Sequence, residues 1–155
     1  MEVGLRDGLQ NIRGDLSVED RLFIIEGLIE AGITNIQIAS FVNPKRVPQM
    51  AFAEDLASRI DKINGIEFSG LVFNQKGVER ALNCGLNKIE TSISISERYS
   101  QKNLAMGVSE SLKNLKDIVA IAKKNSMNIR AGLQCVWGVK DSDSFDQFVV
   151  IERLK

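Results

Sequence analysis

Apolar residues in this chain alternate between helical spacing and short runs typical of strands. Residues 17–32 begin with Ser17, which is suited to cap a helix, and end at Gly32, which is suited to the turn after one. Between them, leucine and isoleucine recur at helical spacing, and β-branched residues then dominate residues 33–39. The pattern predicts a helix followed by a strand.

The same alternation continues along the chain. We predict further helices at residues 51–62, 76–84 and 109–125, the last capped by Ser109, and further strands at 66–72, 86–93 and 127–133. An apolar stub of Val3 and Leu5 would be the first of five strands. Strands that alternate with helices predict parallel pairing with right-handed crossovers. The fold class is therefore α/β, either an open doubly wound sheet or part of a (β/α)8 barrel, which when closed needs about 250 residues.

The last residues differ from this pattern. We place a boundary between residues 1–138, the α/β part, and residues 139–155, a divergent tail. The tail begins with the polar segment 141–144 and then spaces its apolar residues as in an amphipathic helix. No sixth strand is predicted there.

Composition narrows the function classes. The chain has 155 residues, with 20 basic and 20 acidic side chains, so nothing indicates a nucleic-acid partner. No apolar run is long enough for a membrane span, and the sequence predicts a soluble, cytoplasmic protein. The chain has no histidine, which removes the commonest transition-metal ligand and the usual general base. Without a histidine beside it, Cys135 is expected to be a buried structural residue, and Cys84 likewise.

Three segments at predicted strand ends carry candidate chemistry. Arg6 and Asp7 follow the first stub, and they are either a site for a cation and an oxyanion or a surface ion pair. Residues 40–50 form a loop with two prolines and two cations, which favours either an anion-binding rim or a solvated turn. In residues 92–96 serines alternate with isoleucines, so Ser94 is a candidate for hydrogen bonding to a polar substrate, and a long polar loop is expected at 98–103.

These segments resemble the hydroxymethylglutaryl-CoA lyase family of metal-dependent (β/α)8-barrel enzymes related to pyruvate carboxyltransferases. The resemblance rests on residues 2–11 (EVGLRDGLQN), 40–45 (SFVNPK) with 47–50 (VPQM), and 134–138 (QCVWG). It implies the first half of such a barrel, and cleavage of a 3-hydroxy-3-methyl acyl-CoA thioester to acetoacetate and acetyl-CoA. The small-molecule partner would be that thioester, and the cofactor Mg²⁺ or Mn²⁺.

The resemblance also implies residue roles. Asp7 would be the metal ligand from the first strand, and Arg6 would be the catalytic cation that stabilises the enolate of the leaving acetyl-CoA. Gln10 would lie near the substrate. Ser40, Asn43 and Lys45 would line the rim on the side of the coenzyme.

Departures from the family pattern keep alternatives open. Gln37 stands where the family usually has glutamate, and Leu5 stands where it usually has proline. The remaining metal ligands of the family, including its His-x-His pair, and its catalytic cysteine belong to the second half of the barrel. We therefore expect a fragment that binds metal weakly or not at all and is inactive alone. The alternatives are a related acyl-CoA or oxo-acid lyase, or a non-catalytic half-barrel that pairs through its open sheet edges with itself or with a complementing half.

Overall fold

The computed structural model describes residues 1–12, 14, 16–60, 64–138 and 150–151. The predicted tail helix lies almost entirely outside these residues, as does the end of the helix predicted at 51–62. The boundary at residue 138 stays a prediction.

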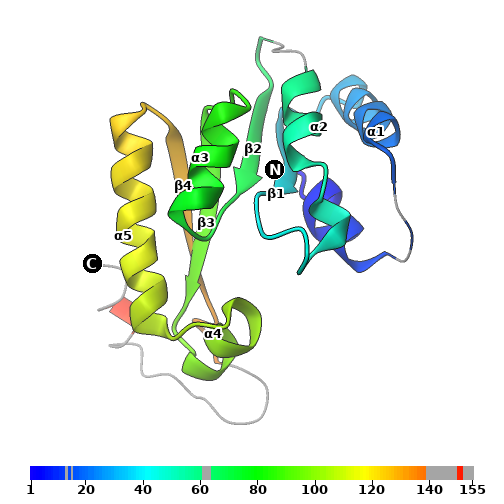
Figure 1. The fold of residues 1–155 in the computed structure, drawn as a ribbon. Coiled ribbons are helices and arrows are strands. Elements are labelled where there is room, and N and C mark those ends of the chain that lie inside the picture. The colour runs from blue at the N-terminus through cyan, green and yellow to red at the C-terminus, as the bar shows by residue number, and fades with distance from the viewer. Residues whose placement is uncertain (13, 15, 61–63, 139–149, 152–155) are drawn as a thin grey trace.

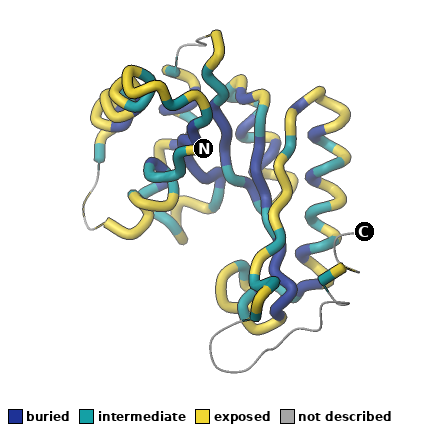
Figure 2. The backbone as a smooth tube through the Cα atoms, turned by 180° about the vertical axis from the view of Figure 1, so that it is seen from behind, coloured by how far each residue is buried: buried dark blue, intermediate teal, exposed yellow. Residues whose placement is uncertain are grey.

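A parallel sheet forms the centre of the described structure. Strands β1 (Asn35–Ser40), β2 (Glu67–Leu71), β3 (Lys88–Ser94) and β4 (Asn128–Gln134) pair in the order β1-β2-β3-β4. All three pairings are parallel, in agreement with the predicted α/β class. β4 is the most exposed of the four strands (Figure 2).

Among the described residues the named α-helices are α1 (Val18–Glu30), α2 (Ala53–Arg59), α3 (Gln75–Asn83), α4 (Glu97–Leu104) and α5 (Val108–Lys124) (Figure 1). They are interspersed with the strands, and both α4 and α5 lie between β3 and β4. The expected cap of α1 is confirmed, because Asp20 N–H donates to Ser17 Oγ at 3.1 Å and the Asp20 carboxylate accepts from the Ser17 backbone. Gly32 follows with φ +83°, a left-handed conformation that suits glycine.

The expected first strand is largely replaced by helical turns. Glu2 makes an isolated parallel bridge to Ile36, and the chain then winds into the π-helical turn η1 (Gly4–Gly8) and the 3₁₀ turn η2 (Leu9–Asn11). The N–H groups of Arg6 and Asp7 both donate to Val3 O, at 3.1 and 2.7 Å, which closes the turn. The described sheet therefore has four strands and one bridge where five strands were expected.

Two other local expectations were wrong. The predicted polar loop at residues 98–103 lies inside α4, whose first turn is capped by Ser96 Oγ. The N-cap of helix α5 lies two residues before the expected cap, Ser109. It is Gly107, and the carboxylate of Glu97 accepts from Val108 N–H at 2.9 Å.

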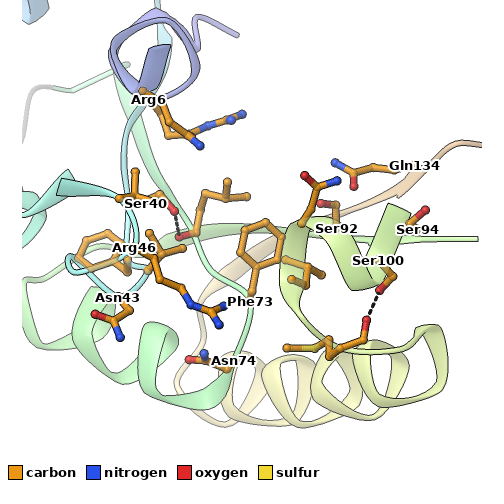
Figure 3. A pocket seen from close by; sticks show the side chains of 18 of the residues that line it. Arg6, Ser40, Asn43, Arg46, Phe73, Asn74, Ser92, Ser94, Ser100 and Gln134 are labelled. Carbon is orange, nitrogen blue, oxygen red and sulfur yellow. Dashed lines mark hydrogen bonds between the residues drawn. The ribbon is translucent and has the colours of Figure 1, made fainter. Parts of the chain in front are cut away.

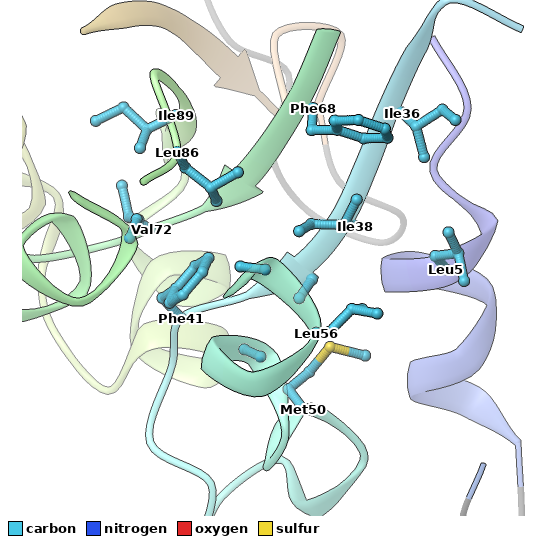
Figure 4. Close-up of a cluster of buried hydrophobic side chains, with 14 of the residues drawn as sticks. Leu5, Ile36, Ile38, Phe41, Met50, Leu56, Phe68, Val72, Leu86 and Ile89 are labelled. Atoms are coloured by element: carbon cyan, nitrogen blue, oxygen red, sulfur yellow. The ribbon is translucent and has the colours of Figure 1, made fainter. Parts of the chain in front are cut away.

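The apolar core lies between the sheet and the helices on one of its faces. Its members include Leu5, Ile36, Ile38, Phe41, Met50, Leu56, Phe68, Val72, Leu86 and Ile89 (Figure 4). Because side chains alternate along a strand, the other face of the sheet receives polar residues, including Gln37, Ser69 and Glu90. Ser69 Oγ donates to Glu90 Oε1 at 2.7 Å, so this polar face is hydrogen-bonded even where it is buried.

Candidate functional site

A cavity of about 710 Å³ opens where the strands end (Figure 3). Its wall is built from the C-terminal ends of all four strands, the turn η1, the loop after β1 and helix α4. This edge of a parallel α/β sheet is where binding sites are normally found, because loops from several strands converge there.

Arg6 is the most firmly held charged group in this wall. Its Nε donates to Gln37 Oε1 at 2.5 Å, and its Nη1 donates to Asp7 Oδ1 at 2.6 Å. Gln37 is only 1% exposed, so the amide that receives this bond is itself fixed by packing. The side chain of Arg6 is 19% exposed and that of Asp7 is 61% exposed. The guanidinium is thus held in place on two sides and still reaches the cavity.

The loop between β1 and α2 forms a second wall, and Arg80 of α3 anchors it. Arg80 Nη1 donates to Val42 O at 2.8 Å, its Nε pairs with the carboxylate of Glu54, and its guanidinium lies 5.8 Å from the centroid of the Phe41 ring. The bond from Arg80 holds the pKa of Glu54 below its ordinary value. Three contacts made by the Arg80 side chain therefore position the start of the loop.

Phe41 also explains a glycine in the neighbouring strand. A Cβ at Gly70 would come within 2.4 Å of Cε2 and 2.8 Å of Cδ2 of the Phe41 ring. Only a residue without a side chain allows the ring to lie this close to β2.

Serines connect the end of β3 to α4 and α5, on the part of the cavity wall formed by β3 and α4. Ser96 N–H donates to Ser94 Oγ at 3.0 Å, and the hydroxyls of Ser100 and Ser111 lie 3.1 Å apart. Ser100 Oγ also donates to Met106 O at 2.8 Å. These bonds give the buried hydroxyls a structural role, and they keep α4 against the end of β3.

Most of the predicted site residues meet in this cavity. The lining includes Arg6, Asp7, Gln10, Ser40, Asn43 and Ser94. Lys45 is exposed and is not among the lining residues, whereas its neighbour Arg46 is. Sequence reasoning also did not single out Asn74, Phe73 or Gln134, each of which lies at or just after a strand end. Their positions after β2 and in β4 were the signal that could have identified them.

The described residues do not form a complete cation site. No group of three or more acidic, cysteine or histidine side chains comes together among them. Asp7 offers one carboxylate, and one of its oxygens already accepts from Arg6. The described lining residues thus include one carboxylate, whereas a divalent cation is bound by several oxygens.

Cys84 lies outside the cavity and has a structural environment. Burial raises the pKa of its thiol, and its Sγ donates to Arg80 O at 3.1 Å. Both effects keep the thiol protonated. Cys135 was expected to be buried but is only half-buried, at the exposed end of β4, and its backbone is left-handed with φ +63°. Neither cysteine lines the cavity. Among the described helices, none is both long and apolar enough to cross a bilayer.

Comparison with known proteins agrees with this geometry. A model of the HMGL-like family matches residues 1–154. A hydroxymethylglutaryl-CoA lyase of Bacillus subtilis is 41% identical over 137 residues, which are 88% of this chain and 46% of the relative. A 3-hydroxy-3-isohexenylglutaryl-CoA/hydroxy-methylglutaryl-CoA lyase of Pseudomonas aeruginosa is 34% identical over 138 residues, 89% of this chain and 46% of the relative.

A solved structure extends the similarity to three dimensions. The crystal structure of the Bacillus subtilis HMG-CoA lyase superposes with a TM-score of 0.92 at 38% identity, covering 99% of this chain and 51% of that one. The chain thus spans about half the length of the curated relatives it matches.

Proposed function

The chain belongs to the HMGL-like family, and we propose that it forms the part of a carbon–carbon lyase site that binds a 3-hydroxy-3-methyl acyl-CoA thioester and stabilises the enolate of its product. The observation that carries this proposal is the pairing of Arg6 with both Gln37 and Asp7 at the wall of the cavity. The curated relatives reported above are named as lyases of such thioesters, which supports the substrate class.

In this proposal, Arg6 is the catalytic residue. Negative charge develops on the thioester oxygen when the C–C bond breaks, and a fixed guanidinium stabilises that charge without reorganising. Gln10, Ser40, Asn43 and Ser94 contribute hydrogen bonds to the substrate. Lys45 is proposed as a more distant contact on the coenzyme side, since its side chain lies outside the cavity lining.

Asp7 is proposed to supply one ligand to a divalent cation, Mg²⁺ or Mn²⁺. When bound, such a cation would hold the substrate's oxygens. Because Asp7 is the only carboxylate among the described residues of the lining, we expect the chain of 155 residues to bind these cations weakly and to show negligible lyase activity. Calorimetric titration with Mn²⁺ and an assay of acetoacetate release check both expectations.

A chimera tests the proposed roles directly. Residues 1–138 of this chain are joined to the remaining half of the Bacillus subtilis lyase, and acetoacetate release is measured. We expect activity in this chimera and a loss of about 100-fold or more in kcat when it carries Arg6→Gln. Arg98→Gln is the matched control, because Arg98 is exposed on α4 and does not line the cavity. A folded Arg6→Gln chimera with unchanged kcat would refute the role of Arg6.

Gln37 favours one alternative substrate class. An amide at this buried position removes a negative charge that glutamate would bring to the cavity, which favours a related acyl-CoA or oxo-acid as substrate. Comparing the chimera with its Gln37→Glu variant on several thioesters distinguishes these substrates. A cytoplasmic location stays a prediction, which cell fractionation tests.

The exposure of β4 favours the non-catalytic alternative. Five of its seven residues are exposed, and no further strand pairs with it in the described part of the chain. Self-association or pairing with a complementing half through this edge predicts a dimer or a larger assembly. Size-exclusion chromatography with light scattering checks this, and a stable monomer at high concentration would refute self-association.

A further inference from the structure

The charges around the cavity do not balance. Among its described lining residues, three side chains are charged: Arg6, Asp7 and Arg46. Arg6 and Asp7 pair with each other, so their charges offset. Arg46 is exposed and has no ion pair within the described part of the chain. The cavity therefore has one unpaired positive charge and favours a negatively charged group beside it.

Two amide side chains in the lining each accept a backbone hydrogen bond through the oxygen and keep the NH₂ group as a donor. Asn43 Oδ1 accepts from Lys45 N–H at 3.0 Å, and Asn74 Oδ1 accepts from Gly77 N–H at 2.9 Å. Each oxygen is thus occupied by the backbone. Neither NH₂ group donates a hydrogen bond among the described residues, so both remain for a ligand. Donors without competing acceptors select for oxygen atoms that carry negative charge.

Local structure holds these donors in place before any ligand binds. Arg46 N–H and Val47 N–H both donate to Asn43 O, at 2.9 and 3.2 Å, which closes a turn around Arg46. Figure 3 shows the Arg46 guanidinium extending from this turn toward the side of the cavity where Phe73 and Asn74 lie. A preformed turn lowers the entropy that binding must remove.

We propose that Arg46, together with the amides of Asn43 and Asn74, binds an anionic group of the ligand at the part of the cavity wall formed by the loop after β1 and the start of α3. This subsite rests on the proposed function, since it assigns a second contact point to the same thioester. The anionic oxygens belong either to a phosphate of the coenzyme or to the carboxylate of the acyl group. Arg46 determines ligand specificity here, whereas the neighbouring Lys45 projects outside the cavity lining.

Isothermal titration of the 155-residue chain with four probes tests this inference. Coenzyme A carries phosphates without the acyl carboxylate, 3-hydroxy-3-methylglutarate carries carboxylates without phosphate, pantetheine carries neither, and inorganic phosphate is the minimal anion. We expect Arg46→Gln to weaken the binding of one anionic class about fivefold to tenfold, between the values typical of exposed and of buried charged contacts. Binding of pantetheine should not change.

Two control variants distinguish a specific contact of Arg46 with the ligand from a nonspecific effect of net positive charge on binding. Lys76→Gln removes the same charge from an exposed position in α3 that does not line the cavity, so it should leave binding unchanged. Arg46→Lys keeps the charge without the planar fork, and we expect an intermediate affinity. Thermal unfolding confirms that each variant is folded, which is expected because position 46 is exposed.

The outcomes distinguish this inference from the proposed function. Equal weakening by Arg46→Gln and Lys76→Gln would overturn the subsite, as would a wild-type chain that binds no anion. Binding of coenzyme A and of 3-hydroxy-3-methylglutarate that does not depend on Arg46 would overturn the subsite and leave the proposed function in place. Binding of inorganic phosphate that depends on Arg46, without any binding of coenzyme A or of 3-hydroxy-3-methylglutarate, would support the subsite and refute the proposed function.

Discussion

Gly70→Ala should destabilise the protein by disturbing the loop that forms one wall of the cavity. A Cβ at position 70 would lie 2.4 Å from Phe41 Cε2 and 3.2 Å from Leu86 Cδ1. Favourable carbon–carbon contacts lie at about 3.5–4.0 Å, so the ring must move by roughly 1 Å. Phe41 is 2% exposed and the guanidinium of Arg80 lies 5.8 Å from its ring centroid, so a shift of the ring disturbs contacts that are already made.

The expected loss in the free energy of unfolding follows from two opposing effects. Overpacking a well-packed core costs about 1–3 kcal/mol. Replacing glycine with alanine restricts the unfolded chain and returns about 0.4–1 kcal/mol. The net destabilisation is about 1–2 kcal/mol, or roughly 2–8 °C in Tm for a domain of this size. Because Phe41 begins the loop that carries Arg46, coenzyme binding should weaken as well.

Urea unfolding followed by circular dichroism measures this change. Gly132→Ala in β4 is the matched control, because the nearest atom to its Cβ would be Ser92 Cβ at 3.6 Å, an ordinary contact. That variant should stay within about 1 kcal/mol of the wild type. Phe41→Leu should relieve part of the effect of Gly70→Ala in a double-mutant cycle. Equal stability of the two alanine variants would refute the steric argument.

Three further predictions concern a positioning residue, a helix cap and an ion pair. In the chimera, Gln37→Leu should lower kcat/KM about tenfold, because the guanidinium of Arg6, the proposed catalytic group, loses an acceptor at 2.5 Å. Loss of a partner at this buried position should also cost about 1–3 kcal/mol of stability, which thermal unfolding of the chimera measures. An unchanged kcat/KM would contradict that role. Ser17→Ala should cost about 1 kcal/mol in urea unfolding through loss of the α1 cap, and a cost near zero would contradict the capping assignment. Glu54 has a folded pKa below its ordinary value of 4.5, so it contributes stability above that pH and the contribution is lost as pH falls through the folded pKa. Glu54→Gln should therefore flatten the loss of stability below about pH 4.5 in urea titrations, and parallel pH profiles of variant and wild type would contradict this.

The alternation of strands and helices was predictable because local signals and packing agree. The β-branched run at residues 33–39 became β1, and Ser17 capped α1 as expected. The prediction of a first strand at Val3 and Leu5 was wrong because of tertiary contacts. Glu2 pairs with Ile36, but the next residues turn back on Val3 O and place Leu5 in the core beneath β1. An alternating apolar pattern of two residues cannot distinguish such a turn from a strand.

Helix α4 was not predictable from hydrophobic spacing. Its sequence is almost entirely polar, and its one buried residue is Ser100. The helix is held by a cap at Ser96 and by the hydroxyl contact between Ser100 and Ser111, which is on the next helix. Contacts of this kind depend on the position of α5, so they leave no apolar period in the sequence.

The site was predictable at the level of segments but not of every side chain. Lys45 and Arg46 are adjacent cations in one loop, and sequence reasoning chose Lys45. The hydrogen bonds of the turn at Asn43 decide that Arg46 lines the cavity. The strand-end rule identified Arg6 and Ser94 correctly as neighbours of one cavity, because it depends on topology and not on side-chain direction.

Gln37 is an uncharged amide, so it adds no negative charge to the pair formed by Arg6 and Asp7. Within the part of the lining that the structure describes, the carboxylate of Asp7 is the only negative group, and it already balances Arg6 at 2.6 Å. A divalent cation at the same carboxylate would lie close to the guanidinium and be repelled by it. A carboxylate at position 37 would offset that repulsion, but the amide of Gln37 does not. The described lining therefore favours an anionic ligand held by arginines over a cation, and any strong cation site must draw its additional negative charge from residues outside this lining.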